Sequence, residues 1–432
     1  MGEGVLAPAI ACPNSADGIS GVTLETIATE AGTPTYVYNA AAIRRQYGSL
    51  VDSLQRVPHR IHYSMKANSS HAVLSLLREL GAGVDIVSGG ELFRALRAGF
   101  TGRDVVFSGV GKTRIELREA LRAGILMVNV ESEGELQLLN DAAGELNSIA
   151  PVALRVNPEV TVDTPHPYTR TGERGLKFGI PYDEAFAVGQ LAISLPNIRL
   201  VGLDMHIGSQ VSSLEPYRAG TERLLELHEK LRSEGAGDIT YLDIGGGLAV
   251  TYGDEAATNV GDFAAAIARL LKNIPLTLIL EPGRFLVGNA GLLLTRVLYR
   301  KRSGGREYII TDAGMNDLLR PSHYNAYHHI ESVRPSGERG VFDVVGPVCE
   351  SGDFFALGRV MDAAVTDDLL AIRSAGAYGF CMSSTYNSRP RPAEVIVDGD
   401  RWAIATERET YADLTRSEVA RLAWRQRKCA SD

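Results

Sequence analysis

The stretch RIHYSMKANSSHAVLSLLREL, residues 60–80, carries one complete strand–loop–helix unit. Apolar and polar residues alternate over 60–66, which predicts a half-buried strand, and the Asn/Ser cluster at 68–70 predicts the start of a helix over 72–80. Lys66 therefore ends a strand, where α/β enzymes keep catalytic groups. A partly desolvated lysine amine can anchor a carbonyl cofactor as a Schiff base, although a solvated lysine fits this stretch alone equally well.

The same unit recurs along the first two thirds of the chain. Strand-like runs occupy residues 60–66, 84–87, 104–107, 126–130, 152–156, 198–205, 240–244 and 276–280. Helical spacing of apolar residues lies between them, at 72–80, 90–98, 114–123, 135–143, 183–195, 215–234 and 262–273. Eight alternations in this length predict a TIM (β/α)8 barrel. The alternative, a doubly wound sheet, lacks a GxGxxG motif after its first strand.

The pattern changes after the eighth strand. From Gly291 onward, β-type runs separated by turns predict a mainly β C-terminal domain with strands at 292–299, 307–311, 342–345, 359–365, 394–397 and 402–406. We expect three segments, namely residues 1–40, the barrel at 41–288 and the β domain at 289–432. A strand at 35–38 precedes the barrel and is assigned to the β domain, although pairing with the barrel is an alternative. The charged tail after Tyr411 is expected to form a terminal helix.

Composition narrows the class of protein. The net charge of −8 and the pI near 5.7 argue against nucleic acid as a partner, because no Lys/Arg-dense stripe is present. The N-terminus lacks the basic region of a signal peptide, and no apolar run approaches the roughly 20 residues of a membrane helix. We therefore expect a cytoplasmic protein that spans no membrane. Four cysteines without a CxxC pair predict neither a disulfide framework nor a metal site.

Polar residues follow or end the eight predicted strands, so a barrel would place them around one mouth. They are Lys66, Asp85, Glu131, Asn157, His206, Gly245, Gly246, Gly247 and Glu281. Isolated polar residues at strand ends are common as caps, but so many on one face favour a shared site.

Two neighbouring motifs indicate the cofactor. Gly245-Gly246-Gly247 lets backbone N–H groups approach an anion, and Arg284 in the EPGR stretch ends the next strand. TIM barrels bind phosphate at these two positions. A phosphate site and a Schiff-base lysine in one mouth point to pyridoxal phosphate. Glu281 beside the pyridine nitrogen would favour its protonated, electron-withdrawing form, and His206 is at the level to stack on a flat ring.

Ten motifs resemble the diaminopimelate decarboxylase family, within the alanine-racemase-like, fold type III class of pyridoxal phosphate decarboxylases. The resemblance covers residues 20 to 415, and the motifs are 63–68 (YSMKAN), 84–92 (VDIVSGGEL), 155–158 (RVNP), 166–168 (HPY), 206–210 (HIGSQ), 243–247 (DIGGG), 281–284 (EPGR), 312–327, 346–353 (GPVCESGD) and 386–395 (YNSRPRPAEV). Ala249, Asp204 and Thr385 depart from the family's common residues without removing a chemical group that the reaction needs.

The resemblance implies roles for individual residues. Lys66 would hold the cofactor aldehyde, His206 would stack on its ring, and Glu281 would pair with its nitrogen. The cofactor site would also include Asp85, Ser209, Gly245, Gly246, Gly247, Pro282, Gly283, Arg284 and Tyr378. Substrate would be bound by Arg284, Arg320, Tyr324, Glu350 and Tyr378.

The resemblance also implies a reaction and a partner. Cys349 would protonate the carbanion left when carbon dioxide departs, and the family brings Cys349 and Glu350 into the site from the second subunit of a homodimer. The expected reaction converts meso-diaminopimelate to L-lysine and carbon dioxide. Two alternatives stay open: decarboxylation of another amino acid, such as ornithine, arginine or a carrier-bound glutamyl group, and a non-catalytic regulator with the same fold.

Overall fold

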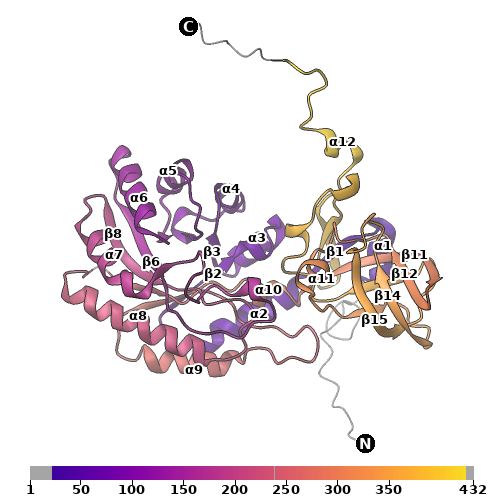
Figure 1. The fold of residues 1–432 in the computed structure, drawn as a ribbon, viewed down its shortest axis with the longest axis horizontal. Helices are drawn as coiled ribbons and strands as arrows, with labels where there is room; N and C mark the ends of the chain where they lie inside the picture. Colours follow the sequence, from indigo (N-terminus) through magenta and orange to yellow (C-terminus); the bar gives the residue numbers. More distant parts are fainter. Residues whose placement is uncertain (1–21, 238, 425–432) are drawn as a thin grey trace, which may run out of the picture.

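The computed structural model describes residues 22–237 and 239–424 and divides them into a barrel and a β domain (Figure 1). The barrel contains eight parallel strands: β2 (His59–Ser64), β3 (Gly83–Ile86), β4 (Val105–Phe107), β5 (Met127–Val130), β6 (Ala150–Asn157), β8 (Ile198–Asp204), β9 (Tyr241–Asp243) and β10 (Thr277–Leu280). They pair in chain order, and β10 returns to β2, which closes the sheet. The predicted TIM barrel is confirmed.

Helices surround this barrel. They are α3 (His71–Glu79), α4 (Gly89–Arg97), α5 (Arg114–Ala123), α6 (Glu133–Glu145), α7 (Tyr182–Ser194), α8 (Glu215–Ser233) and α9 (Val260–Leu270), in the positions that apolar spacing predicts. The helix after β10, α10 (Arg284–Val287), has a single turn. An additional helix, α2 (Ala40–Ser53), contacts both α9 and α3, and so covers the barrel where an eighth outer helix would lie.

The burial of the barrel strands explains why their sequences are runs of apolar residues. All residues of β3 and β5 are buried, because one face packs on helices and the other fills the barrel. Inward-facing side chains from five strands form a separate cluster, Val106, Met127, Ala153, Val201 and Ile279. Asp85 is the register partner of Val106 and therefore points into the same interior. The site is thus built on top of a packed core.

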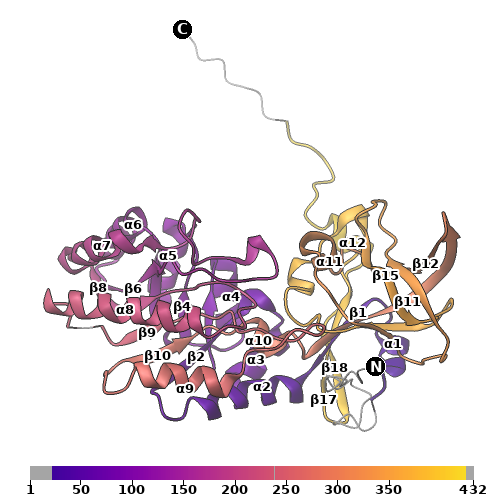
Figure 2. The same cartoon turned by 60° about the horizontal axis from the view of Figure 1, so that its bottom comes forward.

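The β domain contains β1 (Thr35–Asn39), β11 (Gly291–Ser303), β12 (Arg306–Thr311), β13 (Ile330–Ser332), β14 (Arg339–Val345), β15 (Phe354–Asp362), β16 (Leu369–Ile372), β17 (Ala393–Asp398) and β18 (Arg401–Thr406). The N-terminal strand β1 joins this sheet, antiparallel to β11 and parallel to β17. It does not pair with the barrel. Figure 2 shows the β domain beside one end of the barrel, so that residues from both ends of the chain form one unit.

Three details differ from the sequence prediction. The strand expected at 359–365 is β15, which begins earlier, because Phe354 through Asp362 pair with β14 across a bulge. The short strands β13 and β16 were not predicted. The terminal helix is limited to α12 (Tyr411–Thr415), preceded by a capping box on Thr410, and residues 425–432 lie outside the described chain.

Two further predictions concern membrane-spanning helices and cysteines. Within residues 22–237 and 239–424, no helix combines the length and apolar character needed to cross a bilayer. Cys349 and Cys381 are free thiols, and Cys12 and Cys429 fall outside the described residues.

Candidate active site

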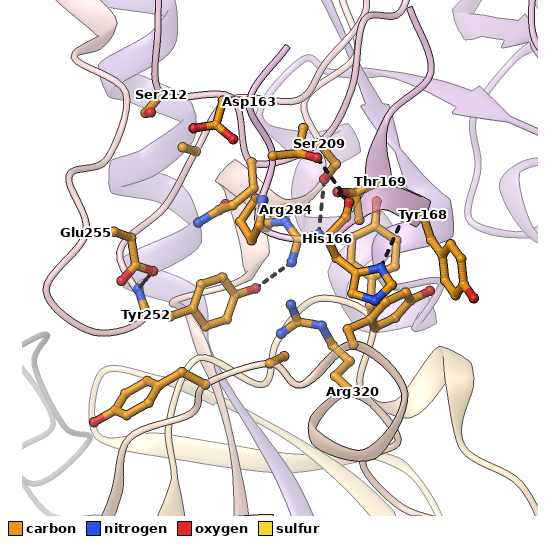
Figure 3. Close-up of a pocket in the computed structure, with 18 of the residues that line it drawn as sticks. Asp163, His166, Tyr168, Thr169, Ser209, Ser212, Tyr252, Glu255, Arg284 and Arg320 are labelled. Atoms are coloured by element: carbon orange, nitrogen blue, oxygen red, sulfur yellow. Dashed lines mark hydrogen bonds between the residues drawn. The ribbon is translucent and has the colours of Figure 1, made fainter. Parts of the chain in front are cut away.

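A cavity of about 640 Å³ opens between the carboxyl ends of the barrel strands and the β domain (Figure 3). The barrel contributes His206, Ser209 and Arg284, and the β domain contributes Arg320, Tyr324 and Tyr378. The loop after β6 covers one side with residues such as His166 and Thr169. The cavity therefore brings together some of the predicted residues from the barrel mouth and three of the predicted substrate residues from the β domain.

Lys66 lies in the single 3-10 turn η1 (Met65–Ala67) that directly follows β2. Its Nζ donates to Asp85 Oδ2 at 2.9 Å, and Ser64 Oγ donates to the same oxygen at 2.7 Å. Burial alone would lower the pKa of Lys66, but Asp85 and Glu281 outweigh it, and the pKa is raised above its usual value. The amine is therefore held as an ammonium, aimed by a buried carboxylate.

The glycine turn after β9 brings backbone close to three neighbouring segments. A Cβ on Gly245 would lie 2.6 Å from Met205 O, one on Gly246 2.1 Å from Glu281 O, and one on Gly247 2.1 Å from Gly208 O. Two of the three N–H groups are used inside the protein, since Gly245 donates to Asp243 and Gly246 to His206. Of the three, Gly247 alone has an N–H without an acceptor among the described residues.

His206 is fixed by the same turn. Its Nδ1 accepts the Gly246 N–H at 3.2 Å, so the ring proton of the neutral form is on Nε2. Burial, with Lys66 and Arg155 nearby, holds the pKa of His206 well below its usual range. The ring is therefore neutral, and it lines the cavity.

Three buried carboxyl groups lie close together, with oxygens of Asp204, Asp243 and Glu281 all within 4.8 Å of one another. Burial and mutual repulsion raise the pKa of Glu281 and Asp204 well above their usual values, and burial raises that of Asp243 to about 7. Such a cluster cannot be fully ionised at neutral pH. Glu281, bonded to Ser108 Oγ and Asn129 Nδ2, can therefore hold a proton at the position expected for the pyridine nitrogen.

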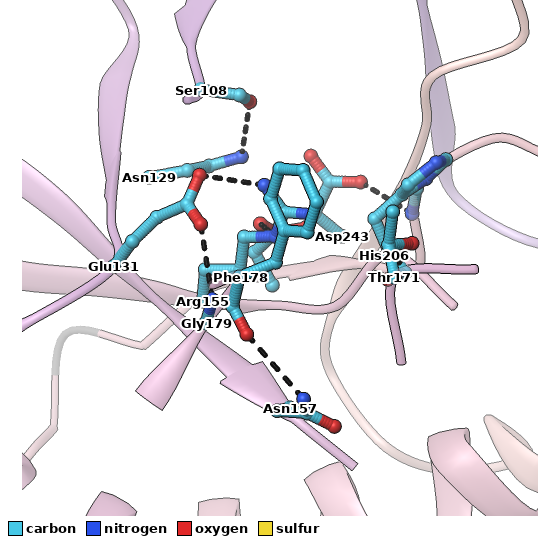
Figure 4. Close-up of polar contacts among 12 residues, drawn as sticks. Ser108, Asn129, Glu131, Arg155, Asn157, Thr171, Phe178, Gly179, His206 and Asp243 are labelled. Atoms are coloured by element: carbon cyan, nitrogen blue, oxygen red, sulfur yellow. Dashed lines mark hydrogen bonds and ion pairs between the residues drawn. The ribbon is translucent and has the colours of Figure 1, made fainter. Parts of the chain in front are cut away.

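Two mouth residues serve the loop after β6 rather than the cavity (Figure 4). Glu131 accepts from Arg155 Nη1 at 2.6 Å and from the Gly179 N–H at 3.0 Å. Asn157 Nδ2 donates to the carbonyls of Glu173 and Phe178. Their polar character is explained by the need to anchor a long loop.

Arg284 occupies the centre of the cavity. It is buried, its Nη2 donates to Ser209 Oγ at 3.0 Å, and its guanidinium lies 4.8 Å from the centre of the Tyr378 ring. Tyr378 has φ +56°, a left-handed conformation that its N–H bond to Ala67 O at 2.7 Å holds in place. Arg320, from α11 (Arg320–Tyr324), reaches the cavity from the opposite side (Figure 3).

Cys349 and Glu350 do not reach this cavity. Both are exposed on the β domain, where the Cys349 N–H donates to Asn387 Oδ1 at 2.8 Å, and neither lines the cavity of the same chain. Tyr252 and His166, which do line it, were given no role from the sequence. Tyr252 follows the glycine turn closely, and that position was the only sequence signal that could have indicated it.

These groups fit pyridoxal 5′-phosphate. Arg284 Nε is buried without an acceptor among the described residues, and the Gly247 N–H of the close-packed glycine turn likewise has no acceptor among them. Buried donors of this kind call for an anion. A lysine amine, a neutral histidine ring and a proton-holding carboxyl group complete the set that the aldehyde, ring and nitrogen require.

Comparison with known proteins identifies the class of enzyme to which the chain belongs. The family model described as "Pyridoxal-dependent decarboxylase, pyridoxal binding domain" matches residues 40–288, so the chain belongs to the pyridoxal phosphate-dependent decarboxylases built on a TIM barrel and uses pyridoxal 5′-phosphate.

Within that class, three similar proteins share the name diaminopimelate decarboxylase. The chain is 50% identical over 399 residues to diaminopimelate decarboxylase of Pseudomonas aeruginosa, covering 92% of this chain and 95% of that protein. It is 49% identical to the enzyme of that name from Vibrio cholerae, covering 91% and 94%. The crystal structure of diaminopimelate decarboxylase from Helicobacter pylori complexed with L-lysine matches with a TM-score of 0.88 and 39% identity, covering 91% and 98%. The chain is a member of the diaminopimelate decarboxylase family.

Proposed function

We propose that this protein removes carbon dioxide from the D centre of meso-diaminopimelate and releases L-lysine, the last step of lysine biosynthesis. The observation that carries the substrate assignment is the pair of buried guanidiniums, Arg284 and Arg320, in one cavity. Neither forms an ion pair with a carboxylate among the described residues. One anion is supplied by the cofactor phosphate, and the second must be a substrate carboxylate that survives the reaction.

When bound, pyridoxal phosphate withdraws electrons from the bond that breaks. Lys66 would hold its aldehyde, His206 would pack on its ring, and Glu281 would keep a proton at its nitrogen. Asp85 aims the Lys66 amine, and Pro282 and Gly283 place Arg284. The phosphate would be surrounded by Ser209, Gly245, Gly246, Gly247, Arg284 and Tyr378. Arg320, Tyr324 and Tyr378 receive the far end of the substrate.

The site requires a second copy of the chain. Cys349 and Glu350 are exposed and lie outside their own chain's cavity, which supports a homodimer in which the partner subunit's Cys349 protonates the carbanion and the partner subunit's Glu350 binds the far ammonium. The segment boundaries at residues 40 and 288 and the cytoplasmic location remain predictions.

Substrate choice tests this proposal. Purified protein with cofactor should release carbon dioxide from meso-diaminopimelate and give L-lysine, with ornithine, arginine and lysine as poor substrates. Ornithine leaves one guanidinium unpaired, and unpaired buried polar groups of this kind support discrimination of roughly 10⁴. Equal rates with ornithine would favour the general decarboxylase, and the absence of any release, with cofactor bound, would favour the regulator.

A further inference from the structure

Tyr252 joins the two guanidiniums of the cavity. Its hydroxyl oxygen accepts from Arg284 Nη1 at 2.6 Å, and its ring centre lies 5.7 Å from the Arg284 Cζ and 4.8 Å from the Arg320 Cζ. Figure 3 shows the Tyr252 ring beside the two arginine side chains, with its hydroxyl directed at Arg284. Tyr252 belongs to the barrel, Arg320 to the β domain, and the ring therefore links the two walls of the cavity.

The hydroxyl of Tyr252 has a proton that the described residues do not use. A phenol offers one donor and accepts through its oxygen, and Arg284 takes the acceptor side. Burial would raise the pKa of Tyr252, but Arg284 and Arg320 outweigh burial and lower it, which makes the O–H a stronger donor. No residue within 22–237 and 239–424 accepts this hydrogen, so it is available to an anion in the cavity.

His328 fixes Arg320 from behind. It is fully buried, and its Nδ1 lies 2.8 Å from the carbonyl of Arg373, which can only accept, so Nδ1 carries the proton. Its Nε2 therefore accepts from Arg320 Nη1 at 2.9 Å. Burial, with Arg320 nearby, lowers the pKa of His328 to about 3, so the ring stays neutral. Arg320 is thus held in place by a neutral partner, and its positive charge is not neutralised by a neighbouring carboxylate.

We propose that Tyr252 binds the far carboxylate of the substrate directly, and that His328 is a positioning residue for Arg320 at the same subsite. This inference rests on the proposed function of the two arginines. A phosphate is the other anion in the cavity, but the geometry separates the two. Arg284 turns Nη2 to Ser209, on the phosphate side, and Nη1 to Tyr252, on the side of Arg320.

The first test compares two ligands that differ in this carboxylate. L-Lysine keeps the far carboxylate of the substrate, and cadaverine has the same two amines without it. In titrations of the holoenzyme, Tyr252→Phe should weaken the binding of L-lysine on the order of 10- to 100-fold, because one hydrogen bond to a charged group is lost. The affinity for cadaverine should change little. Cofactor affinity should not change. Tyr182→Phe, on α7 outside the cavity, is the matched control and should leave all three affinities unchanged.

The second test separates positioning from packing. His328→Phe should raise KM for meso-diaminopimelate with little change in kcat, since it removes the acceptor for Arg320. His328→Gln, whose side-chain carbonyl can accept, should recover part of that loss.

Each outcome has a defined meaning. The role of Tyr252 would be overturned if Tyr252→Phe weakened the binding of L-lysine and of cadaverine equally. It would also be overturned if the variant lost affinity for the cofactor and not for L-lysine. Equal loss in both His328 variants would overturn the positioning role. A wild-type protein that binds cadaverine as tightly as L-lysine would overturn the proposed function itself, and the inference with it.

Discussion

We predict that the contact between Lys66 and Asp85 controls how the rate of cofactor uptake depends on pH. Only the neutral amine can condense with an aldehyde, and Asp85 Oδ2 at 2.9 Å favours the ammonium. Asp85→Asn keeps the shape of the side chain and removes the charge. The pKa of Lys66 is raised in the folded protein, so this change should lower it and increase the neutral fraction at a given pH.

The size of the effect follows from one charge-assisted hydrogen bond, about 1.5–3 kcal/mol, or roughly one to two pKa units. Below the pKa of Lys66, Asp85→Asn should therefore condense with pyridoxal phosphate about 10 to 100 times faster than the wild type. The assay mixes cofactor-free protein with pyridoxal phosphate between about pH 6 and pH 10 and follows the change in visible absorbance.

Ser64→Ala is the matched control, because it removes the other hydrogen bond to Asp85 Oδ2, 2.7 Å long, and keeps the charge. At a given pH it should change the condensation rate much less than Asp85→Asn does. An Asp85→Asn curve that coincides with the wild-type curve would refute the reasoning, since Asp85 would then not control the protonation of Lys66.

Three other predictions address chemistry, assembly and stability. Lys66→Ala should abolish covalent cofactor attachment and turnover, and borohydride reduction followed by peptide mapping of the wild type should label Lys66; a label on another lysine would contradict the assignment. Cys349→Ala should lower turnover on the order of 10²- to 10⁴-fold with little change in cofactor binding, and mixing it with Lys66→Ala subunits should restore part of the activity, because one of the two mixed sites has both groups; proven subunit exchange without recovery would exclude a shared site. Leu203→Ala, fully buried in β8, should lower the free energy of unfolding by about 2–5 kcal/mol in chemical denaturation of the holoprotein, whereas the exposed Leu422→Ala should change it by less than about 0.5 kcal/mol; equal effects would contradict the assigned core.

The sequence alone determined the barrel and the ring of polar residues at its mouth. Parallel strands buried on both faces read as short apolar runs, and a closed barrel brings the carboxyl ends of all of them together. Because each of Lys66, His206 and Glu281 follows its strand directly, its place along the chain was enough to place it at the mouth. The glycine turn at 245–247 and Arg284 were predictable for the same reason.

Contacts between distant segments were decided by the tertiary structure. The strands β13 and β16 have three and four residues. Their pairing with each other and the pairing of β16 with β11 are non-local, so local pattern could not indicate them. The sequence also left open which sheet would take the N-terminal strand. Pairing of β1 with β11 and β17 decided it, through residues that lie far apart in the chain.

The same limit applies within the site. Asp204, Asp243 and Glu281 end three different strands, and their raised pKa values arise only because the closed barrel forces them into one buried volume. The ring of Tyr252, from the barrel, meets Arg320 and His328, from the β domain, only where the two domains pack together. Residue type and strand position are local properties that a sequence contains, whereas burial, protonation and hydrogen-bond partners depend on which segments the folded chain packs together.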